Sequence, residues 1–177
     1  QWTATAAGCC IVGRASEGPY VTHITRGRII DLGVTDMTNM GAAMAPAACD
    51  TLQALFRETN TTHRDYDLIL TGDLGAVGHD IVVELFRREG VELAHYTDCG
   101  LLLYDRKAQD MHAGGSGCGC SAAVLNGFLL GGLRQKRWKR ILFAPTGALL
   151  SPTSSFQGES IPGICHAVVL AADKEDA

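Results

Sequence analysis

Two stretches of the chain place apolar side chains at helical spacing. In residues 45–58 they recur every three or four positions while charged residues take the opposite face, which predicts an amphipathic helix. Pro46 fits the first turn of that helix, where its missing N–H costs nothing. Residues 77–89 repeat the pattern, and Gly90 follows as the expected C-terminal cap.

A third helix, predicted at residues 117–138, is apolar on nearly every face. Between residues 122 and 133 only Asn126 is polar. Such a helix has to be buried on all sides, which is typical of a middle layer between two sheets. Each of its internal glycines costs about 1 kcal/mol relative to alanine, so we expect close packing against another backbone.

Short apolar runs bounded by turn residues predict the strands. Residues 67–71 form a continuous apolar run, which is typical of a parallel strand buried on both faces. The other expected strands are residues 3–12, 20–32, 92–94, 101–104, 141–144 and 164–171. After Gly13 the order is therefore β-α-β-α-β-α-β-β, which predicts an α/β fold with a mixed five-stranded sheet and helices on both faces.

Composition narrows the class of protein. A chain of 177 residues with 46% hydrophobic residues suits one domain. The net charge of -4 argues against a nucleic-acid binder. No apolar run reaches the roughly 18 residues that a membrane span needs, and no secretory signal is recognisable. Seven cysteines without a Cys-x-x-Cys pair favour a reduced, intracellular protein, and we expect no metal site and no cofactor.

Four segments resemble the SpoVAD (stage V sporulation protein AD) family of the thiolase superfamily. They are residues 27–36 (GRIIDLGVTD), 40–48 (MGAAMAPAA), 65–74 (DYDLILTGDL) and 113–121 (AGGSGCGCS), the last echoed by 144–152 (APTGALLSP). In that superfamily two similar halves form a five-layered sandwich. The resemblance implies a thiolase-like half-domain, in which residues 1–13 are the last strand of a missing N-terminal half and residues 14–177 are the C-terminal domain.

The resemblance also implies a function in sporulation. It points to a non-catalytic subunit that binds dipicolinic acid, free or as its calcium chelate, in the machinery that moves this compound across the spore membrane. The expected partners are other membrane subunits of the same complex, the N-terminal half and a second copy of the chain, but no nucleic acid. The expected location is peripheral, on the cytoplasmic face of the forespore or spore inner membrane. An acyl-transfer enzyme half and an assembly scaffold are the alternatives.

No catalytic residue is expected in this chain. Thiolases carry their nucleophilic cysteine in the N-terminal half, which is not part of this sequence. His112 lies where their Gly-His-Pro motif would place a histidine, but Met111 and Ala113 replace the flanking glycine and proline. Residues 144–148 stand where thiolases carry a Cys-x-Gly-Gly-Gly motif. His112 is therefore predicted to line a pocket rather than to act as a base.

A glycine-rich loop before the third helix is the main candidate for ligand binding. It consists of Gly114, Gly115, Ser116, Gly117 and Cys118. Unpaired N–H groups and the positive end of the helix dipole favour a carboxylate there, and glycines let a ligand approach the backbone. The alternative is that these glycines only permit tight packing.

Two further polar features have a functional and a structural interpretation. Asp73 follows a strand, at the edge where α/β sheets place ligand-binding groups, but it equally suits a loop carboxylate or a helix cap. Five basic residues gather at the end of the third helix, namely Arg134, Lys136, Arg137, Lys139 and Arg140. They complement the helix dipole, and contact with anionic lipid headgroups is the alternative.

Overall fold

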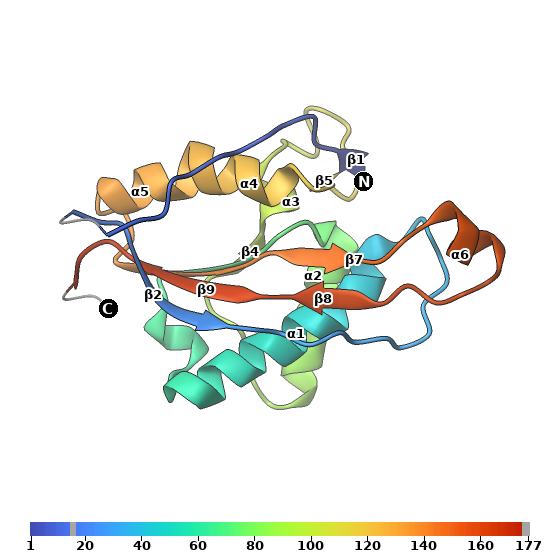
Figure 1. Ribbon diagram of the computed structural model, residues 1–177, viewed down its shortest axis with the longest axis horizontal. Helices are drawn as coiled ribbons and strands as arrows, with labels where there is room; N and C mark the ends of the chain where they lie inside the picture. The colour runs from blue at the N-terminus through green and yellow to red at the C-terminus, as the bar shows by residue number, and fades with distance from the viewer. Residues whose placement is uncertain (15–16, 175–177) are drawn as a thin grey trace.

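A five-stranded mixed sheet forms the centre of the computed structural model, which describes residues 1–14 and 17–174 (Figure 1). A mixed sheet of five strands is what the pattern of elements predicts, and its strand order is β2-β9-β6-β3-β4. Strand β3 pairs in parallel with β4 and β6, whereas β9 runs antiparallel to β6 and β2. The strands are β2 (Tyr20–Thr25), β3 (Leu68–Thr71), β4 (Tyr96–Asp98), β6 (Arg140–Ala144) and β9 (Ala167–Ala171).

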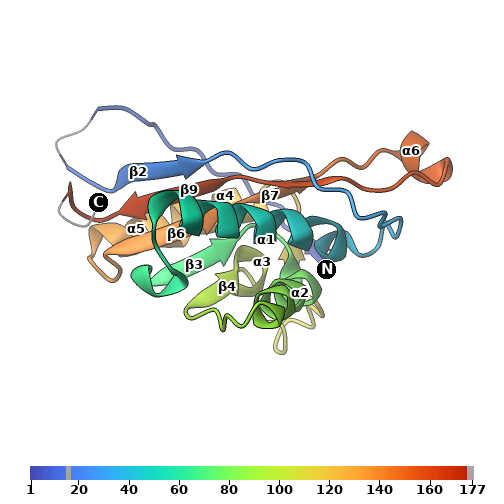
Figure 2. The same ribbon diagram turned by 90° about the horizontal axis from the view of Figure 1, so that it is seen from below.

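Helices cover both faces of this sheet (Figures 1 and 2). On one side lie α1 (Met40–Thr59) and α2 (Gly75–Arg88), with the short turn η1 (His63–Asp65) between α1 and β3. On the other side lies α3 (Cys99–Leu102), beside one longer helix that consists of three consecutive parts. These parts are α4 (Cys120–Val124), η2 (Leu125–Leu129) and α5 (Leu130–Arg134).

Two layers of apolar side chains hold the sheet between its helices. Ile69 of β3 packs toward α1 and α2, and the next residue, Leu70, packs toward the α4–α5 helix. In β6, Leu142 likewise packs toward α1 and α2, and Phe143 packs toward the α4–α5 helix. Because successive side chains of a strand point to opposite faces, these central strands need apolar residues at every position.

The first helix begins earlier than its apolar spacing predicts. The Asn39 side chain accepts a hydrogen bond from the N–H of Ala42 (3.3 Å), so the helix begins at Met40. Pro46 consequently lies inside the helix rather than in its first turn, which corrects that prediction. A Cβ on Gly41 would collide with the carbonyl of Leu74, so the helix begins in close backbone contact with the start of α2.

The segments predicted as strands 92–94 and 101–104 are not strands. The strand is β4, and α3 follows it because the Asp98 side chain accepts a hydrogen bond from the N–H of Gly100 (2.9 Å) and starts a helical turn. Predicted strand 20–32 ends at Thr25, although Ile30 still forms an isolated bridge with Gly163.

Two short strand pairings lie outside the main sheet. Predicted strand 164–171 is divided at His166 into β8 (Gly163–Cys165) and β9. Strand β8 pairs with β7 (Thr146–Ala148), and the loop between them carries α6 (Pro152–Phe156). Predicted strand 3–12 is reduced to β1 (Trp2–Thr3), which pairs with β5 (Gly115–Ser116). Among the described residues no strand pairs with residues 5–12. These residues therefore do not form a strand, although their sequence is apolar.

The third helix packs on the sheet as predicted, and within the described part of the chain its other side is covered only in part, by residues 6–8, where a Cβ on Gly8 would collide with the carbonyl of Ala122. Leu129 and Leu133 are buried against the sheet, whereas Phe128 is 40% exposed. A Cβ on Gly131 would contact nothing within 4 Å. The π-helical part, where the N–H of Leu130 bonds to the carbonyl of Leu125, includes Asn126, whose side-chain amide donates to the carbonyl of Ala122 (2.9 Å). No helix among the described residues is long and apolar enough to cross a membrane.

Two adjacent glycines of α5 give a matched test of this packing. Gly132→Ala should destabilise the chain by about 1–3 kcal/mol, because the new Cβ would collide with the rigid ring of Trp138. Gly131→Ala should stabilise it by about 1 kcal/mol, because alanine favours the helix and meets no neighbour. Urea unfolding of both variants measures the difference. Changes of the same sign in both variants would contradict the described position of Trp138.

Candidate functional site

The C-terminal ends of β3, β4 and β6 meet at one edge of the sheet, where the loop of residues 113–119 lies against them (Figure 1). The buried carboxylate of Asp98 holds this edge together. Its Oδ2 accepts hydrogen bonds from the hydroxyl of Thr71 (2.7 Å) and the N–H of Leu74 (3.0 Å). Its Oδ1 accepts from the N–H groups of Gly75 (3.0 Å) and Gly100 (2.9 Å).

These contacts make Asp98 a cap for two helices at once. Gly75 begins α2, and Gly100 lies in the first turn of α3, so both helix starts donate to one anion. Burial raises the pKa of the Asp98 carboxyl, and its hydrogen bonds from Thr71 and the three N–H groups act in the opposite direction. A fully buried carboxylate with four donors is a structural anchor.

Asp73 joins the glycine-rich loop to the turn after β6. Its Oδ2 accepts from the N–H of Gly117 (3.0 Å), and its Oδ1 accepts from the hydroxyl of Thr146 (2.8 Å). The Thr146 hydroxyl in turn accepts from the N–H of Asp73 (3.3 Å). Burial is the main influence on the Asp73 carboxyl and raises its pKa. The structure thus brings Asp73 and the loop together, with the carboxylate engaged by the protein itself.

Close packing accounts for several glycines of the loop. A Cβ on Gly115 would lie 3.1 Å from the ring of Tyr104 and 3.3 Å from Leu103. Gly114 and Gly117 have φ values of 94° and 95°, which favour glycine strongly. The packing interpretation of these glycines therefore has direct support.

The helix begins later than predicted, and this shifts the candidate donors. Residues Gly115 and Ser116 form β5, and α4 starts at Cys120. The N–H of Gly117 is taken by Asp73, whereas the N–H groups of Cys118 and Gly119 have no hydrogen-bond acceptor among the described residues. Cys118 is exposed. Gly119 is buried against the carbonyl of Ala6, so the N–H group open to a carboxylate is that of Cys118.

His112 lies apart from these groups. It is exposed, has a φ of 43°, and places its Nε2 4.0 Å from the carboxylate of Asp110. Its carbonyl accepts a hydrogen bond from Nε of Arg106 (2.7 Å), which fixes the loop but not the ring. That His112 lines a pocket stays a prediction.

The structure adds two residues that the sequence pattern did not single out, Asp98 and Thr146. Asp98 is the last residue of β4, which the sequence pattern places at residues 92–94, so its position at the sheet edge is not apparent from the sequence. Thr146 lies within the segment 144–152 that resembles the family, and this was the available signal. Its contact with Asp73 joins residues 73 positions apart.

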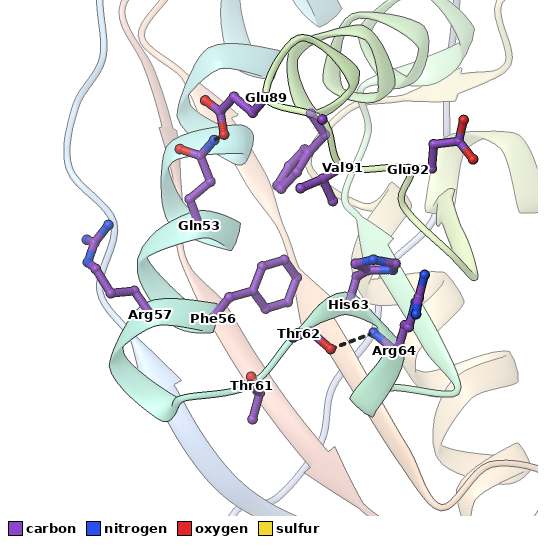
Figure 3. A pocket seen from close by; sticks show the side chains of 12 residues that line it. Gln53, Phe56, Arg57, Thr61, Thr62, His63, Arg64, Glu89, Val91 and Glu92 are labelled. Atoms are coloured by element: carbon purple, nitrogen blue, oxygen red, sulfur yellow. Dashed lines mark hydrogen bonds between the residues drawn. The ribbon is translucent and has the colours of Figure 1, made fainter.

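A cleft of about 810 Å³ lies elsewhere, between the C-terminal ends of α1 and α2 and the η1 turn (Figure 3). Phe56, Phe86 and Val91 form its apolar part. The Nδ1 of His63 accepts the N–H of Ala94 (3.0 Å) at its side. The cleft contains none of the predicted site residues. Its charged lining is balanced, with Arg57 and Arg64 against Glu89 and Glu92, so its electrostatics favour neither anions nor cations.

Comparison with known proteins gives three similarities. The sequence model of the stage V sporulation protein AD (SpoVAD) family matches residues 1–171. The chain is 45% identical over 168 residues to stage V sporulation protein AD of Bacillus subtilis (strain 168), covering 94% of this chain and 49% of that protein. It thus spans about half the length of this curated relative.

The third similarity is to a solved structure, the tetronic acid condensing enzyme AbyA1. The TM-score is 0.53 at 15% sequence identity, and the match covers 90% of this chain and 49% of the enzyme. This likeness shows a shared thiolase-like fold, and at this identity it carries no activity over to the chain.

Asp98→Asn should destabilise the chain by about 2 kcal/mol or more, because an amide turns an N–H group toward donors that a carboxylate oxygen accepted. The matched control is Asp80→Asn, whose side chain is 79% exposed and which should change stability by no more than about 0.5 kcal/mol. Urea unfolding followed by circular dichroism measures both. Equal stabilities of the two variants would show that Asp98 is no anchor.

Proposed function

Because this chain belongs to the SpoVAD family, whose members are sporulation proteins, we propose that it is part of a dipicolinic-acid-binding subunit. In this proposal the subunit works without catalysis in the spore membrane machinery that takes up and releases dipicolinate. It lies peripherally on the cytoplasmic face of the membrane, associates with the membrane subunits of that machinery and forms a homodimer.

The observation that carries the proposal is the clamped loop before α4. Asp73 and the glycine contacts fix the loop, and the N–H group of the exposed Cys118 remains as a donor beside the start of a long helix. Donors that are already fixed in place bind a carboxylate without an ordering cost, and the helix dipole adds to the attraction. Dipicolinate offers two carboxylates of this kind.

Charge favours the calcium chelate over the free dianion. The loop of residues 113–119 contains no lysine or arginine, and the carboxylate of Asp73 lies next to it. A free dianion is repelled by a nearby carboxylate, whereas a calcium chelate of dipicolinate is neutral overall. In the proposal calcium therefore arrives with the ligand.

The state of the cysteines supports the absence of acyl transfer. Burial raises the pKa of Cys49, Cys120 and Cys165 to about 12, and it also raises the pKa of Cys99. A thiol with such a pKa is protonated at neutral pH, and the thiolate is the form that attacks an acyl group. Together with the exposed position of His112, this leaves these four thiols without a means of activation.

Asp73→Ala in the intact protein should weaken binding of the calcium chelate of dipicolinate at least about tenfold, or roughly 1.4 kcal/mol, because the loop loses its clamp. Thr146→Val removes only one of the two clamp contacts and should have a smaller effect. Titration calorimetry measures affinity, and thermal melts confirm folding.

The control for that titration is Asp80→Ala, which changes an exposed carboxylate on α2. Unchanged affinity in folded Asp73→Ala would remove the clamped loop from the binding site. Absence of any dipicolinate binding by the wild-type protein would favour the scaffold alternative.

Acetoacetyl-CoA should be neither cleaved nor formed by this chain, since its buried thiols remain protonated. The measurement follows the ultraviolet absorbance of the magnesium enolate of acetoacetyl-CoA, with an active thiolase as positive control. Turnover that disappears in His112→Ala would establish the acyl-transfer alternative instead.

A further inference from the structure

The turn between α5 and β6 gathers a third of the cations of the chain on a short surface segment. Five of its 15 lysines and arginines fall within seven consecutive residues, although the chain as a whole carries a net charge of -4. Four of them are exposed, namely Arg134, Lys136, Arg137 and Lys139. We call the segment of residues 134–140, together with Phe128, the basic turn. It lies at the opposite end of the molecule from α6 (Figure 1).

Within residues 1–14 and 17–174, three of the five cations of the basic turn have no carboxylate partner. Lys136 pairs with Asp173 (2.6 Å), but Arg134, Arg137 and Lys139 form no ion pair with any described residue. The carboxylate of Asp67 lies close by, and it accepts the backbone N–H groups of Lys139 (2.7 Å) and Arg140 (3.0 Å) rather than their side chains. The exposed side chains of Arg134, Arg137 and Lys139 can therefore meet an external anion.

Aromatic rings lie directly among these cations. The rings of Phe128 and Trp138 meet edge to face at 5.4 Å, and the guanidinium of Arg137 lies 5.4 Å from the centre of each. Gly132 leaves the space that Trp138 occupies against the helix. The exposed part of Phe128 and the indole thus form an apolar surface bordered by positive charge.

The backbone of the turn gives an independent indication that the lysine matters. The N–H of Lys136 bonds to the carbonyl of Leu133 and that of Arg137 to Gly132, which is the hydrogen-bond pattern of a Schellman helix end. Such an end places its left-handed residue where glycine is strongly favoured, yet Lys136 occupies it with a φ of 55°. Capping alone does not explain a lysine at this position.

We propose that the basic turn binds the headgroup layer of an anionic lipid bilayer. Lysine and arginine attract acidic headgroups, while tryptophan and phenylalanine enter the boundary between headgroups and acyl chains. Nucleic acid fits less well, because the cations form one convex turn with apolar rings between them, and the rest of the chain is acidic. The inference rests on the membrane location within the proposed function, and it identifies the basic turn as the surface that contacts the membrane.

The test is sedimentation of the intact protein with vesicles, in the absence of dipicolinate. Vesicles of phosphatidylcholine with phosphatidylglycerol should bind the wild type at least about tenfold more strongly than vesicles of phosphatidylcholine alone, and added salt should reduce the difference. The double variant Arg134→Glu with Arg137→Glu should lose at least about tenfold of the binding to the anionic vesicles. Because no dipicolinate is present, failure here leaves the dipicolinate titration to decide the proposed function separately.

The matched control reverses two arginines on the other side of the sheet, Arg87→Glu with Arg88→Glu, which are 66% and 71% exposed on α2. It should bind anionic vesicles within about twofold of the wild type. If the glutamate variant of the basic turn does not fold, Arg137→Gln with Lys139→Gln replaces it, with an expected loss of at least about fivefold.

A second measurement tests whether the ring of Trp138 enters the lipid layer. Quenching of tryptophan fluorescence by brominated lipid should fall more in Trp138→Phe than in Trp2→Phe, which removes the other indole of these 177 residues. The proposal is overturned by wild-type protein that ignores anionic vesicles at low salt, or by equal binding of the basic-turn variant and the control. Binding of the basic turn to a DNA or RNA oligonucleotide without binding to vesicles also overturns it.

Discussion

The carboxylate of Asp98 is the contact on which the functional edge of this fold depends. A buried anion is strongly unfavourable unless its lone pairs are satisfied, and four donors from β3, the start of α2 and the start of α3 satisfy them. The same donors would themselves be unpaired without the carboxylate, because residues at helix starts have no intrahelical acceptor for their N–H groups. The carboxylate and its donors therefore require each other, and together they hold the ends of the strands in one arrangement.

This anchor extends to the loop through adjacent residues. Leu74 donates to Asp98, and the residue before it, Asp73, accepts from Gly117 and Thr146. The segment after β3 thereby links the start of α2, the glycine-rich loop and the turn after β6 into one hydrogen-bonded unit. A loop held in this way can keep an N–H group aimed at a carboxylate without rearrangement, which is the feature that the proposed function uses.

The sequence predicts the sheet and the long helices because their patterns repeat over many residues. It fails where an element is too short to show a period: β4 and α3 together span residues 96–102, and the side chain of Asp98 decides where one ends and the other begins. The anchor itself could not be predicted, since Asp98 and Thr71 are 27 positions apart and come together only in the folded sheet. The glycine content of residues 114–118 identifies the loop in the sequence. The sequence does not show which of its N–H groups lack an acceptor, because that depends on the contact of Gly117 with Asp73.

The helix through α4 and α5 combines two demands that a single amphipathic pattern cannot meet. Its buried face packs on the sheet through Leu129 and Leu133, while small residues such as Gly127 and Gly131 leave the opposite face flat and open. A flat face of this kind allows another backbone to approach closely, which is what the thiolase-like resemblance implies for the N-terminal half. The cations begin only at Arg134, beyond the apolar stretch. Charge is thus kept away from the face suited to packing and concentrated at the end suited to an anionic surface.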